Sequence, residues 1–158
     1  TGTDKVSVFA GVRKLSDAAR GVLVELSTST STNNGSLGLE VPDNPGTTVA
    51  MRSRGTLTVH AVAVIATAPV SLIMSSVNNI AGDVCSLRSN GSIVATTAAD
   101  QGTGNYGNYP LYLFRRAGTS IPFNGWFYGL AITGRLTTDA ETVATERFLA
   151  AKSAVVIP

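Results

Sequence analysis

The chain has 158 residues, enough for one domain with a sizeable hydrophobic core. Its net charge of +2 is too small to predict binding to nucleic acid or to an anionic membrane, and only 14% of its residues are charged. The single cysteine, Cys85, excludes an internal disulfide and a cysteine-based zinc site. Because Cys85 lies beside Val84 and Leu87, we expect it to be a small buried hydrophobe.

Short apolar runs separated by turn residues fill the chain as far as Gly134 and predict a series of β-strands. Apolar residues alternate with polar ones in most of these runs, as they do in strands that bury one face. The segment STSTSTNNGS, residues 27–36, separates two of the runs and is expected to be a mobile loop. The strands expected before residue 56 cover residues 5–15, 22–26, 37–41 and 48–55.

The next segment, residues 57–74, carries no formal charge and has the length of a membrane span. However, Thr58 and His60 alternate with apolar neighbours, which is strand periodicity, and Pro69 interrupts the run. We therefore expect two successive strands divided near Ala68-Pro69, and no membrane insertion.

The clearest hairpin signal is DVCSLRSNGSIVATT, residues 83–97, in which Asn90-Gly91 supplies the positive φ angles of a tight turn. Two further strands are expected within residues 109–116 and 123–134. The chain then changes in kind, because Thr138-x-x-Glu141 is a capping box and helical periodicity continues to residue 153. Together these patterns predict an all-β, two-sheet antiparallel β-sandwich (jelly roll) with one C-terminal helix, forming a single domain over residues 1–158.

Eight of the ten aromatic residues lie between Asn105 and Leu130. Within and just beyond this segment, the residues expected in the core are Leu111, Leu113, Phe123, Leu130 and Ile132.

The aromatic residues of the last strand leave two alternatives open. Phe123 and Phe127 have the opposite parity to Leu130 and Ile132, so all four face the core only if the strand bulges near Gly129. Such a bulge would turn Trp126 outward. Without it, the buried row would be Trp126, Tyr128, Leu130 and Ile132.

No catalytic centre is visible in the sequence. His60 lies in an apolar strand pattern, away from residues suited to a nucleophilic triad, and is expected to be a core or sheet-face histidine. Glu25 is the one carboxylate well inside an expected strand, and the converging pair that a sandwich glycosidase needs is not visible. The acids at turns, such as Asp43, are expected to be capping or solvated groups, and Arg52 is likewise expected to be solvated.

These observations predict a chain that is not an enzyme and that needs no cofactor or metal. A calcium site built from turn oxygens is an alternative, but no D-x-D-x-D spacing supports it.

Binding is the better expectation, because the segment DQGTGNYGNYP, residues 100–110, has the composition of binding loops. Aromatic rings at the surface can stack on the apolar faces of sugars, while arginine and amide groups bind hydroxyls. We expect Trp126, Tyr106 and Tyr109 at the surface, and with Arg116 they are the candidate ligand-binding residues.

Several segments resemble the end of a concanavalin A-like lectin/glucanase domain, the laminin-G-type jelly roll. They are SLRSNGSIVA, YPLYLFRRAG and PFNGWFYGLAITGRLTTDAETVATERFLAAK. The opening TGTDKVSVFAGVRKLSDAARGVLVELS is similar to the front strands of versions in bacteriophage and prophage virion proteins. The resemblance implies no catalytic residue here. Phe114 and Ala117 stand where such phage domains tend to have glycine, and Trp126 stands where they have a polar residue.

The residues and the resemblance together predict a non-enzymatic carbohydrate- or receptor-binding module of a phage tail or spike protein. It would lie on the virion, bind a host surface glycan, and form homo-oligomers through a longer parent chain of which it is the C-terminal part. The alternative is a structural virion domain that mediates assembly or oligomerisation without binding sugar. A glycosidase is the least favoured reading, because no carboxylate pair supports it.

Overall fold

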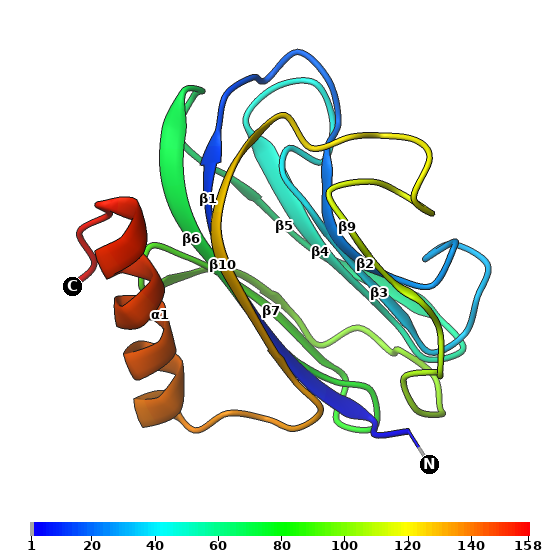
Figure 1. The fold of residues 1–158 in the computed structure, drawn as a ribbon. Helices are drawn as coiled ribbons and strands as arrows, with labels where there is room; N and C mark the ends of the chain where they lie inside the picture. Colours follow the sequence, from blue (N-terminus) through cyan, green and yellow to red (C-terminus); the bar gives the residue numbers. More distant parts are fainter. Residues whose placement is uncertain (1) are drawn as a thin grey trace.

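The computed structural model describes residues 2–158 and contains two five-stranded sheets packed face to face, with one helix (Figure 1). Sheet A has the strand order β10-β1-β6-β7-β8, and sheet B has the order β5-β4-β3-β2-β9. The pairings between neighbouring strands are antiparallel. The predicted all-β sandwich with a C-terminal helix is therefore confirmed.

Each expected strand is present. Sheet A consists of β1 (Lys5–Lys14), β6 (Val70–Asn79), β7 (Val84–Ser89), β8 (Ser92–Thr97) and β10 (Gly125–Thr133). Sheet B consists of β2 (Val22–Leu26), β3 (Ser36–Glu40), β4 (Thr48–Arg54), β5 (Thr58–Val64) and β9 (Leu111–Leu113). The uncharged segment 57–74 forms β5 and the start of β6, and in the described part of the chain no helix is long and apolar enough to cross a membrane.

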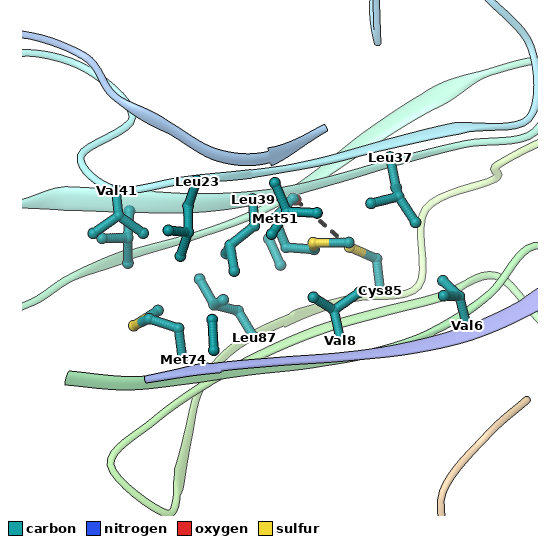
Figure 2. Packing of buried hydrophobic residues seen from close by; sticks show 14 of the residues in the cluster. Val6, Val8, Leu23, Leu37, Leu39, Val41, Met51, Met74, Cys85 and Leu87 are labelled. Atoms are coloured by element: carbon teal, nitrogen blue, oxygen red, sulfur yellow. Dashed lines mark hydrogen bonds between the residues drawn. The ribbon is translucent and has the colours of Figure 1, made fainter. Parts of the chain in front are cut away.

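The main core lies between the inner faces of the two sheets (Figure 2). Leu37, Leu39 and Met51 of sheet B point toward Val8 and Cys85 of sheet A. The Cys85 thiol lies 3.6 Å from the Met51 carbonyl oxygen, and burial raises its pKa to about 12. Cys85 is thus a protonated, buried hydrophobe, as predicted.

Helix α1 (Asp139–Ser153) covers the outer face of sheet A, on the side away from sheet B (Figure 1). Leu149 and Ala150 pack on Phe9 and Ile73 in a second, smaller core. Beneath the helix, the buried Glu146 carboxylate accepts hydrogen bonds from Ser75 and from Arg88. The outer face of sheet A is therefore partly occupied by the chain's own helix.

Of the two alternatives for the last strand, the structure has the bulge near Gly129. Gly11 pairs with Gly129 while Val12 pairs with Phe127, leaving Tyr128 as the extra residue. Phe127 then lies on the inner face and meets the Phe114 ring edge-on, with ring centroids 4.9 Å apart. Phe123 and Leu130 pack against the main core, as expected.

Three residues expected in the core are exposed instead: Leu111, Leu113 and Ile132. These residues pair with residues whose side chains point into the sandwich, so the prediction that they face inward was correct. However, β9 and β10 are the edge strands of their sheets, and the rim between them remains open to solvent.

The difference between core and rim is testable with two leucines. Leu39 is 0% exposed, and replacing it by Ala should lower the free energy of unfolding by about 2–5 kcal/mol through lost burial and a cavity. Leu113, at 39% exposed, is the control, and Leu113→Ala should cost much less in the same denaturant titration. Equal losses would contradict the assignment of Leu113 to an open rim.

The capping box of α1 predicts a pH dependence. The hydrogen bonds from Arg135 and from the Thr138 backbone lower the pKa of Glu141 from 4.5 to about 2. Its stabilising effect is therefore present above pH 4.5 and is lost as the pH falls toward 2. Glu141→Gln should lower the melting temperature at neutral pH, and the difference from the parent protein should shrink in acid. A difference that is constant across pH would show that the charge of Glu141 contributes nothing.

Candidate functional site

The four residues predicted to bind a ligand do not gather at one place. Trp126 is 59% exposed, as expected, and lies on the outer face of sheet A, where the Arg13 guanidinium sits 5.7 Å from its ring centroid. Arg116 faces Glu25 on the outer face of sheet B, on the opposite side of the sandwich. A single site containing both residues is therefore excluded within one copy of the chain.

Tyr106 corrects the sequence prediction, because its side chain is buried rather than displayed. It is only 6% exposed and belongs to the main core, and its hydroxyl lies 2.6 Å from the Ser53 hydroxyl. Ser53 faces inward from β4 and is bonded both to the Tyr106 hydroxyl and to the Gln101 amide oxygen, so the tyrosine belongs to a buried polar group at this end of the core. Tyr109 is exposed, as expected, and its hydroxyl donates to the Asn34 carbonyl at 3.0 Å.

The outer face of sheet B carries a polar row that crosses the strands. Four residues lie in line across neighbouring strands. Glu25 of β2 pairs with Gly38 of β3, and Arg52 of β4 pairs with both Gly38 and His60 of β5. These positions have the opposite parity to the core residues of the same strands, so their side chains point away from sheet A.

A second acid on this face, Glu40 of β3, is shared by two arginines. Arg20 donates from Nε to Glu40 Oε2 at 3.0 Å and contacts Oε1 through its terminal nitrogen. Arg52 Nε lies 2.9 Å from Glu40 Oε1, and Arg52 also donates to Asp43 Oδ1 at 2.6 Å. We call the group Arg20, Glu40, Asp43, Arg52 and His60 the sheet B ion cluster.

Burial sets the electrostatics of the cluster. The Glu40 side chain is 3% exposed, and desolvation together with its contact to Asp43 raises its pKa despite the two arginines. Burial favours a higher pKa for Asp43, but its contacts with Glu40 and Arg52 outweigh that effect and lower the pKa. The pKa of Arg52 is raised by the two acids, so its guanidinium stays charged.

Beside the cluster, Glu25 is buried and holds a turn in place. Its Oε2 accepts a hydrogen bond from the Ala117 backbone at 3.0 Å, and its Oε1 lies 3.6 Å from Arg116 Nε. Burial raises the pKa of Glu25, with these contacts opposing the shift. The turn is strained, because Phe114 and Ala117 have φ angles of 64° and 49°.

A cleft of about 270 Å³ opens beside the cluster and is lined by Thr30, Ser31, Arg52, Thr58 and His60. We call it the sheet B cleft. One wall is the loop after β2, which lies so close to β3 that a Cβ at Gly38 would be 3.2 Å from Thr30 Cγ2. The Arg52 side chain, 18% exposed, forms its charged end.

The arrangement suits recognition of an anion. Each terminal nitrogen of Arg52 carries two N–H groups. Nη1 contacts both ring nitrogens of His60, and Nη2 donates to Asp43, which leaves one N–H group of Nη2 for a ligand. The buried acids beneath keep the guanidinium in one orientation. Across residues 2–158, no three His, Cys, Asp or Glu side chains are grouped so as to hold a metal ion.

This site was not predicted from the sequence. Arg52 and Asp43 were expected to be solvated, whereas both are engaged in ion pairs and largely buried. One sequence feature does point to it. Glu40, Arg52 and His60 alternate with apolar residues along their strands, which places their side chains on the outer face. That signal cannot show which of these residues become neighbours, because this depends on strand pairing. His60 is a sheet-face histidine, as predicted.

The fold is shared with carbohydrate-binding domains of known structure. No protein-family model matches the chain, and no curated protein matches its sequence. The CBM40 domain of the Ruminococcus gnavus IT-sialidase superposes with a TM-score of 0.69 at 18% identity, covering 92% of this chain and 84% of that domain. The same domain is also known bound to α2,3- and α2,6-sialyllactose.

Two larger proteins contain a similar sandwich. The leech intramolecular trans-sialidase matches with a TM-score of 0.65 at 12% identity, covering 98% of this chain and 24% of the enzyme. A botulinum neurotoxin type C structure, described as entering cells through two ganglioside molecules, matches at 0.63 and 11% identity, covering 92% of this chain and 36% of that one. At these identities the likeness establishes the fold, a lectin-like β-sandwich.

The correction at Tyr106 can be checked with a pair of tyrosines. Tyr106→Phe removes a buried hydroxyl that is hydrogen-bonded to Ser53, and should cost about 1 kcal/mol of unfolding free energy. Tyr109→Phe removes an exposed hydroxyl and should change stability by less than about 0.5 kcal/mol. If Tyr109→Phe were the more costly change in chemical denaturation, the roles assigned to the two rings would be reversed.

Proposed function

We propose that this chain is a non-enzymatic carbohydrate-binding module that binds an acidic glycan in the sheet B cleft. The observation that carries the proposal is the Arg52 guanidinium, held by Glu40 and Asp43 at the end of a cleft on the outer face of sheet B. Arginine held in this way is suited to a planar, bidentate anion such as a carboxylate.

The structural comparisons support this class of ligand. The R. gnavus domain binds sialyllactose, whose terminal sugar carries a carboxylate, and the neurotoxin interacts with gangliosides. The cleft, at about 270 Å³, is slightly smaller than sites for drug-sized ligands, so it suits one terminal sugar residue. Ser31 is the exposed hydroxyl-bearing residue of the lining and is placed for the sugar's own hydroxyls, whereas Thr30 is buried and the Thr58 hydroxyl is bonded to Arg54.

The positions of Glu40 and Asp43 favour glycan binding over glycan hydrolysis. Glu40 has a raised pKa and Asp43 a lowered one, which is a pattern also found in acid–base pairs. However, the two carboxyl groups contact each other and are both buried, whereas a retaining glycosidase holds its pair about 5 Å apart around the scissile bond. Their positions therefore suit the support of Arg52 and leave no room for a substrate between them.

The biological setting is proposed from the sequence resemblance alone. The chain would be part of a phage tail or spike protein on the virion, bind a host surface glycan, and associate with copies of itself through the parent protein. Trp126 then has a separate role, because it lies on the other side of the sandwich from the cleft. Its exposed ring would stack on a second sugar or on a neighbouring subunit.

The test is calorimetric titration of the domain with 3′-sialyllactose, using lactose as the uncharged control. Sialyllactose should bind and lactose should not. Arg52→Lys keeps the positive charge between Glu40 and Asp43 but loses the planar fork, and should weaken binding about tenfold or more. Arg147→Lys makes the same change on the exposed face of α1, so it is the matched control and should bind as the parent does.

Other outcomes would change the assignment. If the folded domain bound none of the glycans on an array but formed oligomers in solution, it would be a structural virion domain. If Trp126→Ala abolished glycan binding while Arg52→Lys did not, the glycan site would lie on sheet A. In both cases the proposal for the sheet B cleft would be wrong.

A further inference from the structure

His60 faces the sheet B cleft and is in direct contact with its charged end. Arg52 Nη1 lies 2.7 Å from Nε2 and 3.2 Å from Nδ1 of the His60 ring. The other charged groups that act on His60 are Asp43, from the turn between β3 and β4, and Arg20, which precedes β2. The remaining cleft residues are the uncharged Thr30, Ser31 and Thr58.

The contact with Arg52 favours a neutral imidazole in the free protein. Arg52 Nη1 lies against both ring nitrogens, so a protonated ring would place a second positive charge next to the guanidinium. Partial burial and the positive charge of Arg52 both lower the pKa of His60, with Asp43 opposing them. At neutral pH the ring beside Arg52 is therefore uncharged. Arg54 is a second cation near the cleft, where it donates to the Ser31 carbonyl oxygen and to the Thr58 hydroxyl.

We propose that His60 takes up a proton when the carboxylate of an acidic sugar binds beside Arg52, so that ligand binding is linked to pH. The inference rests on the proposed function. The bound carboxylate supplies a negative charge that offsets the repulsion between Arg52 and an imidazolium. The proton comes from solvent and no covalent bond changes, so the ring gains one positive charge as the ligand brings one negative charge.

The sign of the pH effect follows from this exchange. The ligand raises the pKa of His60. At pH values between the pKa of the free protein and that of the complex, His60 is therefore protonated in the complex but neutral in the free protein. Affinity must then rise as the pH falls through that interval, by about tenfold for each unit by which the ligand raises the pKa. A neutral sugar brings no charge and should leave the pKa of His60 unchanged.

The sequence makes the measurement direct, because His60 is the one histidine in the chain. Its ring proton resonances can be followed by NMR from pH 5 to pH 8, without ligand, with saturating 3′-sialyllactose, and with lactose. The expected result is a His60 pKa below the ordinary 6.5 in the free protein and a higher value with sialyllactose alone.

Titration calorimetry at several pH values, in buffers of different ionisation enthalpy, gives the affinity and the number of protons taken up. His60→Gln is the matched variant, because an amide can accept a hydrogen bond from Arg52 but does not titrate. It keeps Glu25 and Glu40, whose raised pKa values would produce any pH dependence that remains. The variant should bind sialyllactose with little proton uptake and a flatter pH profile.

The outcomes separate the two proposals. If sialyllactose binds but leaves the His60 pKa unchanged, or if His60→Gln keeps the full pH dependence, proton linkage through His60 is wrong and the glycan site stands. If sialyllactose does not bind at any pH in this range, both proposals fail.

Discussion

One buried carboxylate shared by two arginines determines what the outer face of sheet B can do. Glu40 lies between Arg20 and Arg52, and its charge is costly to bury without them. Asp43 is a second acid in contact with Arg52, so the cluster contains two acids and two guanidinium groups. Such pairing holds the arginines in fixed orientations on a sheet face that is open to ligands on one side. A solvated arginine would have to lose side-chain freedom on binding, whereas Arg52 has largely lost it on folding.

The sandwich itself explains why the polar groups gather there. The inner faces are filled with apolar side chains, and the outer face of sheet A is partly covered by α1 through Leu149 and Ala150. The outer face of sheet B has no helix over it within the described residues, and the loop after β2 and the turn around Ala117 cover it only in part. The backbone strain at Phe114 and Ala117 lies in the turn that Glu25 holds. A strained backbone of this kind persists only where surrounding contacts hold it in place. Such strained residues are common at binding sites.

The sequence was sufficient for the fold because the relevant signals are local. Alternation predicted the strands, Asn90-Gly91 the hairpin, and Thr138 and Glu141 the helix start. Gly129 allowed a bulge, but the sequence left open whether the strand has one. The site depends on contacts between segments that are distant in the chain. Arg20 meets Glu40, and Tyr106 meets Ser53, only after the strands have paired. Alternation likewise gave the correct face for Leu113 but not its exposure, since burial depends on whether a strand lies at the edge of its sheet.

The most direct measurement of the central claim is a crystal structure of the domain soaked with 3′-sialyllactose. The account predicts density for the terminal sugar in the cleft between Thr30 and His60, with its carboxylate within hydrogen-bonding distance of the Arg52 guanidinium. Well-ordered sugar elsewhere, for example stacked on Trp126 across the sandwich, with the sheet B cleft empty, would contradict it.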